Sequence, residues 1–324
     1  MRLVTARAPA RMDFGGGWTD VPPWSTEQGG CVCNAAITLY ASVRLHDELV
    51  RAPSATSDVA LAQAALRRAE LGNVTAEVSS SFPKNAGLGG SSAVGVALQA
   101  AIARWRGEDV DGAALAERSR NVEVEEMGIA GGRQDHYAAV FGGLLGLRFG
   151  ERVTIRCLVA SADLVRDISA RCIVAYTGES RISGDTITAV MDAYRARERR
   201  VVQALRRMGA LAGQMIDAFE NHSLNDVAEL VSEHWEYQRA LHPSITTPGI
   251  EHVIAVARAA GATGCKALGA SGGGCVLAIA EDGREDELAA AIAPLGERLE
   301  FGIDRDGFQV IAVLDEHHDE GESG

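Results

Sequence analysis

The chain has 324 residues, of which 47% are hydrophobic and 23% charged, a composition typical of globular proteins and a length sufficient for two domains. The net charge of −13 argues against general nucleic-acid binding, which needs a basic surface. No apolar run is long enough to span a membrane and the N-terminus lacks a signal-peptide pattern, so we expect a cytoplasmic protein without membrane partners. No feature indicates an oligomeric state.

Strand-like and helical patterns alternate along the chain, which predicts a mixed α and β fold. The first half contains predicted strands at 3–8, 38–46 and 74–79, predicted helices at 59–71, 93–104 and 111–127, and a short segment at 133–140. The second half contains a strand at 171–177, a helix-rich region at 185–240, and then helix 248–260, strands 265–268 and 275–280, helix 285–293 and strand 309–314. We expect domains at 1–165 and 166–315, followed by a disordered tail at 316–324.

The six cysteines form no C-x-x-C pair and have no accompanying His cluster. In a chain of this length they are predicted to be reduced and mostly buried, rather than disulfide-bonded or bound to zinc.

The most informative segment is the glycine loop at 83–93, which precedes an almost wholly apolar helix. Glycines let the backbone approach an anion closely, and the helix that follows presents free N–H groups and the positive end of its dipole. The segment lacks the G-x-x-x-x-G-K-[ST] pattern of a P-loop. We predict a phosphate site formed by Lys84, Asn85, Gly87, Leu88, Gly89, Gly90, Ser91 and Ser92. Lys84 is one of only two lysines, and a solvated position is equally open for it.

Two further glycine-rich segments, at 9–20 and 266–274, flank this loop in the sequence. The three motifs, in this order, resemble those of the kinase superfamily named for galactokinase, homoserine kinase, mevalonate kinase and phosphomevalonate kinase (GHMP). Within it, the runs 15–23, 131–139 and 177–181 are similar to those of bacterial heptose 7-phosphate kinases, which act at the anomeric C1 hydroxyl. The resemblance implies an α+β, two-domain GHMP fold, with an N-terminal domain like domain 2 of ribosomal protein S5 and a ferredoxin-like C-terminal domain.

The resemblance also assigns roles in the transfer of a phosphoryl group from ATP, which depends on positioning and charge neutralisation. Asp135 matches the catalytic carboxylate that accepts or orients the proton of the acceptor hydroxyl, and Arg11 matches the basic residue of the first motif. Ser92 and Glu123 match the residues that hold Mg²⁺. The cofactors implied are ATP and Mg²⁺.

The remaining assignments concern the acceptor sugar. Asp20 aligns with a sugar-binding carboxylate, which can accept two hydroxyl hydrogen bonds. Trp18 either stacks on a sugar or packs in the core. Arg181 and Arg133 are candidates for the distal phosphate of the acceptor. The full set of predicted substrate residues is Asp20, Thr19, Gly17, Gln134, Arg181, Gly272 and Gly273.

We expect an ATP-dependent kinase that acts on the C1 hydroxyl of a heptose 7-phosphate or related heptose. The alternatives are a kinase of fucose or of an unusual sugar of specialised metabolism, and a non-catalytic sugar and ATP sensor. A decarboxylase of the mevalonate branch is disfavoured by Thr19-Asp20 and Gln134-Asp135.

Overall fold

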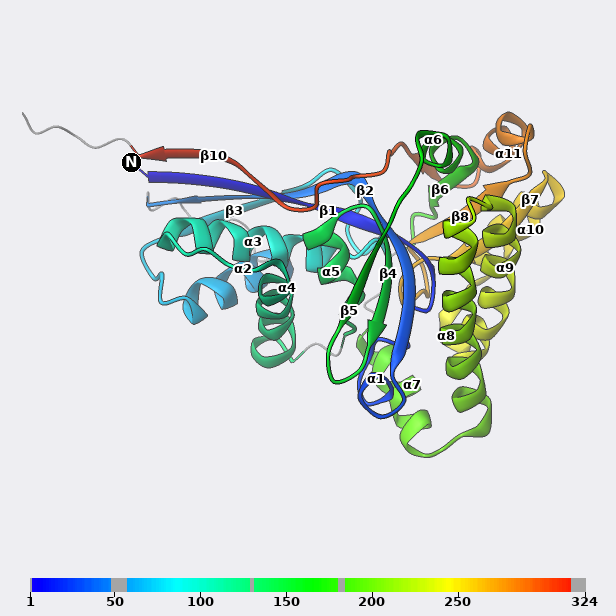
Figure 1. The fold of residues 1–324 in the computed structure, drawn as a ribbon, viewed down its shortest axis with the longest axis horizontal. Helices are drawn as coiled ribbons and strands as arrows, with labels where there is room; N and C mark the ends of the chain where they lie inside the picture. The colour runs from blue at the N-terminus through cyan, green and yellow to red at the C-terminus, as the bar shows by residue number, and fades with distance from the viewer. Residues whose placement is uncertain (1, 48–56, 129–130, 180–183, 316–324) are drawn as a thin grey trace, which may run out of the picture.

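The computed structural model describes residues 2–47, 57–128, 131–179 and 184–315 (Figure 1). Two antiparallel sheets, each packed against helices, form the described part of the chain. None of the described helices is long and apolar enough to cross a membrane. All six cysteines are free, and all but Cys157 are buried, as predicted from their spacing.

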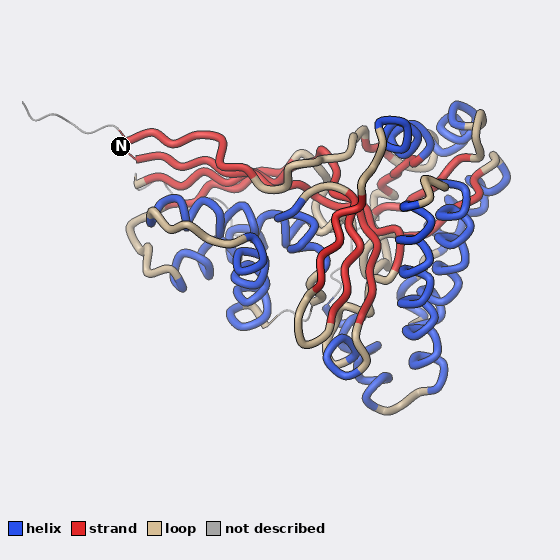
Figure 2. Tube along the Cα trace, viewed as in Figure 1, coloured by secondary structure: helices blue, strands red, loops and turns tan. Residues whose placement is uncertain are grey.

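The first sheet is built on two long strands, β1 (Arg2–Gly15) and β2 (Gly30–His46), which pair along almost their whole length. The strand order is β10-β1-β2-β4-β5, and β3 pairs with β2. Figure 2 shows the long strands running from one end of the molecule into its centre. The other strands of this sheet are β3 (Thr75–Ser80), β4 (Leu144–Phe149), β5 (Thr154–Leu158) and β10 (Gln309–Asp315).

The last described strand joins the first sheet. Residues 309–315, which fall within the expected second domain at 166–315, form β10 and pair with β1 at the edge of the first sheet. A local strand pattern shows that a segment is extended but does not show which partner it joins, because pairing is a tertiary property. The chain therefore begins and ends its described part in the same sheet.

Helices of the first half cover one face of this sheet (Figure 1). They are α2 (Ser57–Arg68), α3 (Gly90–Arg106), α4 (Gly112–Asn121) and α5 (Gln134–Phe141). The apolar helix α3 is buried on most sides, as its sequence predicts. The helix predicted at 111–127 is interrupted, because the backbone widens at Asn121 into a π-helical turn, Val122–Glu126. Such turns often occur at functional sites.

The second sheet has the strand order β7-β8-β6-β9, all antiparallel. Its strands are β6 (Cys172–Tyr176), β7 (Ala262–Ala267), β8 (Cys275–Ala280) and β9 (Glu297–Leu299). In chain order this is the 4-1-3-2 arrangement of a ferredoxin-like fold, which confirms the expected class. The helices are α6 (Ala162–Arg171), α7 (Gly184–Arg195), α8 (Arg199–Glu220), α9 (Leu224–Leu241), α10 (Pro248–Ala259) and α11 (Glu285–Ile292), with a short α1 (Trp24–Glu27) in the first half and a 3₁₀ turn at Pro243–Ile245.

One apolar core joins the two halves. It combines residues of β1, β2, α8, α9 and the second sheet. Phe14 of β1 packs edge-on against Phe219 of α8, with ring centroids 4.8 Å apart. The two sheets are thus held together by side-chain packing, and the groups brought in by β1 and by β7 are fixed relative to each other.

This shared core generates a stability prediction. Phe219 is 1% exposed, so Phe219→Ala removes a large buried ring and should lower the free energy of unfolding by about 3–5 kcal/mol. Denaturant unfolding followed by circular dichroism measures this. The control Val159→Ala changes a side chain that is 86% exposed and should stay within about 0.5 kcal/mol of the parent. Similar losses in both variants would contradict the shared core.

Candidate active site

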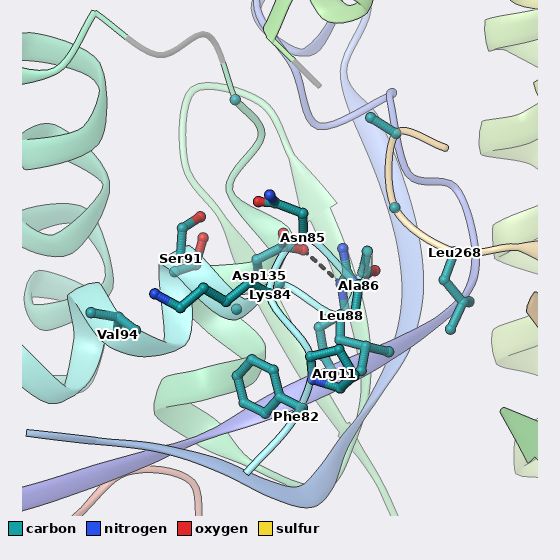
Figure 3. Close-up of a pocket in the computed structure, with 18 of the residues that line it drawn as sticks. Arg11, Phe82, Lys84, Asn85, Ala86, Leu88, Ser91, Val94, Asp135 and Leu268 are labelled. Atoms are coloured by element: carbon teal, nitrogen blue, oxygen red, sulfur yellow. Dashed lines mark hydrogen bonds and ion pairs between the residues drawn. The ribbon is translucent and has the colours of Figure 1, made fainter. Parts of the chain in front are cut away.

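A cavity opens where the loop after β3 meets the N-terminus of α3 (Figure 3). Its wall comes from both halves of the chain, because the loop after β7 contributes Leu268 to Ser271 and Gly273. All the residues predicted to bind the nucleotide line it, namely Lys84, Asn85, Gly87, Leu88, Gly89, Gly90, Ser91 and Ser92. The structure therefore gathers the predicted phosphate loop around one cavity.

The glycines of this loop are required by close contacts. Gly89 is the N-cap residue of α3 and has a φ of 70°. A Cβ on Gly87 would lie 2.6 Å from the carbonyl oxygen of Leu268, and one on Gly89 would lie 3.1 Å from the side chain of Asp135. The first N–H groups of α3 have no partner within the helix and carry its positive dipole end. The cavity is therefore suited to a phosphate group.

Arg11 and Asp135 form an ion pair at the wall of this cavity (Figure 3). Arg11 Nε donates to Asp135 Oδ1 at 2.7 Å, and Nη1 donates to the carbonyl of Gly87 at 2.5 Å. Burial lowers the pKa of Arg11, but nearby carboxylates, Asp135 first, outweigh it and hold this pKa above its ordinary value. Arg11 is thus a fixed cation between the glycine loop and Asp135.

A second, smaller cavity adjoins the first. Its lining residues are Arg11, Asp13, Gly17, Trp18, Asp20, Val21, Gly132, Gln134, Asp135, Ile187, Gly269 and Ala270. Arg11 and Asp135 line both cavities, so their ion pair lies where the two meet. Trp18 packs in the core, which was one of the two alternatives drawn from the sequence, and it also lines this wall. The arrangement suits a reaction between two molecules held on either side of one carboxylate.

Asp20 holds the start of the helix that carries Asp135. Its Oδ2 accepts hydrogen bonds from the backbone N–H groups of Arg133, at 2.7 Å, and Gln134, at 3.0 Å. A Cβ on Gly132 would lie 1.9 Å from this oxygen, so only glycine fits there. Burial raises the pKa of Asp20 to about 6, although these backbone donors oppose the shift. Asp20 thus fixes α5 and still faces the smaller cavity.

Glu123 and Ser92, the predicted metal ligands, both line the larger cavity. Their side chains meet at His136, whose Nε2 lies 3.2 Å from Ser92 Oγ and 3.3 Å from Glu123 Oε2. Burial raises the pKa of Glu123, but the neighbouring His136 outweighs it and the pKa lies below its ordinary value. Glu123 Oε1 is buried without a hydrogen-bond partner. A carboxylate and a hydroxyl oxygen are suitable ligands for Mg²⁺, so these residues fit the ion.

The described residues contain no group of three or more His, Cys, Asp or Glu side chains placed to hold a metal. Any Mg²⁺ would therefore take most of its ligands from water and from phosphate oxygens, which is its usual behaviour in kinases.

Two residues predicted to contact the substrate line neither cavity. The hydroxyl of Thr19 donates to the carbonyl of Gly16 at 2.6 Å and accepts from the N–H of Cys31 at 3.1 Å, and Thr19 lines neither cavity because it is packed under the turn. Gly272 is likewise absent from both walls, since its N–H donates to the carbonyl of Ile245.

The other predicted contacts have mixed outcomes. Lys84 lines the larger cavity, and its Nζ forms an ion pair with the carboxylate of Asp58 at 2.6 Å. Gly273 lines the larger cavity, whereas Gly17 and Gln134 line the smaller one. Arg181 lies outside the described residues.

Sequence reasoning missed Asp13, Ile187 and His136. Asp13 follows Arg11 by two positions in a strand, so both point to the same face, and this alternation could have identified it. Ile187 reaches both cavities from α7, and nothing in its local sequence indicates this.

A glycine loop at a helix N-terminus, and an Arg–Asp pair between two adjoining cavities, define a phosphotransferase of small molecules. The chain matches the model of the GHMP kinases N terminal domain over residues 54–143 and that of the GHMP kinases C terminal region over residues 215–296. Together these matches span more than half of the chain, and it belongs to the GHMP kinase family.

Individual relatives differ in length. A bifunctional fucokinase/GDP-fucose pyrophosphorylase of Arabidopsis thaliana is 26% identical over 93% of this chain, which spans 32% of that protein. A D-glycero-alpha-D-manno-heptose 7-phosphate kinase of Campylobacter jejuni is 23% identical over 90% of this chain and 94% of its own length. The chain thus spans about a third of the fucokinase relative but nearly all of the heptose kinase.

Solved structures show the same fold. A D-glycero-D-manno-heptose 1-phosphate kinase from Bacteroides thetaiotaomicron superposes with a TM-score of 0.76 at 21% identity, covering 96% of this chain and all of that one. Leishmania major mevalonate kinase, solved with R-mevalonate, gives a TM-score of 0.71 at 14% identity, covering 92% of this chain and 95% of that one. At these identities the likeness establishes the two-domain fold.

The raised pKa of Asp20 predicts a pH dependence of stability. A carboxyl whose pKa is higher in the folded state than its ordinary value of 3.8 binds protons more tightly when folded, so its contribution to stability falls as pH rises from about 4 to about 6. Asp20→Asn keeps an acceptor oxygen for α5 and removes this dependence. The free energy of unfolding of the variant, relative to the parent, should rise by about 2 kcal/mol across that window.

Denaturant unfolding at several pH values measures this difference, in which the titrations of all other groups cancel. Parallel curves for the two proteins would show that Asp20 titrates normally.

Proposed function

We propose that this chain is a sugar kinase that transfers the γ-phosphoryl group of ATP to the anomeric C1 hydroxyl of a heptose 7-phosphate or a related heptose. The observation that carries the proposal is the position of the Arg11–Asp135 pair, which lines both cavities. ATP occupies the larger cavity, with its phosphates on the glycine loop, and the acceptor occupies the smaller one.

The residues at the junction supply the transfer chemistry. Asp135 accepts, or orients, the proton of the acceptor hydroxyl as that oxygen attacks the γ-phosphorus. Arg11 is fixed by Gly87 and Asp135 and lies beside the transferred group, where its charge opposes the charge that develops on the phosphoryl oxygens. Ser92 and Glu123 would hold Mg²⁺, which neutralises phosphate charge when bound. Glycines 87 and 89 keep the loop close to the junction.

Two arginines favour an acceptor that already carries phosphate. Burial and the neighbouring Arg133 lower the pKa of Arg120, and Asp20 is close enough to oppose the shift. The Nε atoms of both arginines are buried without a hydrogen-bond partner, and Arg133 Nε lies 3.5 Å from Glu117. Both guanidinium groups lie near the carboxylate of Glu117, and a further anion, such as the distal phosphate of a heptose 7-phosphate, would be a second partner for them.

The second candidate is a kinase of fucose or of another unphosphorylated sugar. It is favoured by the Arabidopsis relative and by an L-fucokinase/L-fucose-1-P guanylyltransferase of Bacteroides fragilis. The latter is 25% identical over 95% of this chain, which spans 38% of that protein. A sugar and ATP sensor without turnover is less well supported, because Arg11 and Asp135 are both present and paired.

An acceptor panel separates these candidates. ADP release is measured with ATP, Mg²⁺ and each of heptose 7-phosphates, free heptoses, fucose, galactose, mannose, homoserine and mevalonate. Turnover of a heptose 7-phosphate, with phosphate found on C1 by ³¹P NMR, is the expected result. Turnover of unphosphorylated sugars alone would overturn the distal-phosphate assignment, and ATP binding without any turnover would favour the sensor.

The role of Asp135 gives a mutational prediction. Asp135→Asn keeps the shape of the side chain but removes the carboxylate that receives the proton, so kcat should fall about 10²- to 10⁴-fold. Affinity for ATP, measured by calorimetry, should change less than threefold. The matched control is Asp58→Asn, which alters a carboxylate of the same cavity away from the junction. Near-normal turnover by Asp135→Asn would exclude the proposed role.

A further inference from the structure

Asp13 is a buried carboxylate for which the reaction outlined above gives no role. It lies two residues after Arg11 on β1, and both side chains lie on the same face of the strand. Asp13 is 2% exposed and lines the smaller cavity but not the larger one. Its position places it on the acceptor side of the junction.

Only one oxygen of Asp13 has a partner. Lys266 Nζ donates to Asp13 Oδ2 at 3.0 Å, and this lysine is fully buried. Asp13 Oδ1 is buried and has no hydrogen-bond partner. A buried carboxylate oxygen left unpaired is costly and calls for an explanation, such as a ligand that supplies the missing donor.

The surroundings keep Asp13 ionised. Burial raises the pKa of its carboxyl group, but the charges of Lys266 and Arg11 outweigh this effect and hold the pKa below its ordinary value. Lys266 comes from β7, in the second sheet, so the pair links the two halves of the chain. Asp13 therefore remains a strong hydrogen-bond acceptor at neutral pH.

The neighbouring groups fit a polyol. A Cβ on Gly17 would lie 2.7 Å from Asp13 Oδ2, so glycine leaves room beside the carboxylate. Trp18 lines the same cavity, and its Nε1 is buried without a partner. Two residues of this wall, Asp13 and Trp18, thus carry an unpaired acceptor and an unpaired donor, which match a sugar hydroxyl because it donates and accepts at once. Asp20 is less available, because its Oδ2 already accepts two backbone hydrogen bonds.

We propose that Asp13 binds the acceptor directly, accepting a hydrogen bond from a sugar hydroxyl, and that Lys266 is the positioning residue that holds this carboxylate in place from the second sheet. The proposal rests on the function proposed above and adds to it a residue that determines sugar specificity. Because Asp13 does not reach the nucleotide cavity, its loss should affect the acceptor alone.

The first test is steady-state kinetics of Asp13→Asn with the best acceptor of the panel. The loss of a hydrogen bond to a charged group should raise the KM of the acceptor about 10- to 100-fold, while the KM of ATP changes less than threefold. A series of deoxy sugars then identifies the hydroxyl. The analogue that lacks it should be a poor ligand for the parent but no worse than the complete sugar for the variant. An equal penalty for every analogue in both proteins overturns the proposal.

Asp304→Asn is the matched control, because Asp304 is also buried but lines neither cavity. This variant should keep the KM values of both the acceptor and ATP.

Lys266→Met tests the positioning role. In the double variant with Asp13→Asn, the KM of the acceptor should be no higher than in Asp13→Asn alone. The double variant also lacks the unpaired buried charge that opposes folding in Lys266→Met. Additive effects would show that Lys266 does not act through Asp13.

Calorimetric titration of the acceptor sugars separates this inference from the proposed function. It is carried out in the Asp135→Asn background, where turnover does not interfere. Sugar binding that weakens on addition of Asp13→Asn supports the inference. Equal binding with and without that change overturns the inference alone. If the parent protein binds none of the sugars, both the proposed function and this inference fail.

Discussion

The hydrogen bonds of Arg11 fix the geometry on which the rest of the site depends. Its backbone N–H donates to the carbonyl of Leu88, its Nη1 to that of Gly87, and its Nε to the carboxylate of Asp135. One residue of β1 therefore sets the position of the glycine loop and of the first turn of α5 together. A guanidinium group suits this task because its donors are held in a rigid plane and it stays charged when buried. Lysine would keep the backbone hydrogen bond, but its single flexible ammonium group would not fix both side-chain contacts in this geometry.

The second sheet completes this arrangement from the opposite side. The N–H of Cys275 donates to the carbonyl of Ala86, and a Cβ on Gly274 would lie 2.8 Å from the same oxygen. The glycine loop is thus held between β1 and the loop that joins β7 to β8. Together with the Lys266–Asp13 pair, these contacts make both halves necessary for either cavity. Lys266, one of only two lysines in the chain, is buried where the two halves meet.

Local patterns predicted most helices correctly, as well as the glycine loop that lines the larger cavity, because helix periodicity and glycine-rich turns depend on neighbouring residues. What the patterns did not show depends on contacts between distant segments. The pattern of 309–314 showed a strand but not its pairing with β1, and the helical pattern of 111–127 did not show the π-turn at Glu123. The motif that includes Thr19 indicated a substrate contact, but the turn directs its hydroxyl to backbone groups instead. The alternation of β1 places Asp13 on the face of Arg11, but its pairing with Lys266, 253 residues away, depends on a tertiary contact.

Three carboxylates adjoin Arg11, and their surroundings distinguish them. Asp135 is partly exposed and faces both cavities, which suits a group that exchanges a proton. Asp20 lies at a helix N-terminus with its pKa raised by burial, and Asp13 is kept ionised by two cations. Set against the two cations Lys266 and Arg11, these three carboxylates leave this end of the smaller cavity without a positive excess. A distal phosphate would be poorly placed there, whereas Arg120 and Arg133, which influence each other's charge, have buried Nε atoms without a hydrogen-bond partner. Under the proposed function, a phosphorylated acceptor would therefore bind with its neutral anomeric end at Asp135 and its anion towards the arginines.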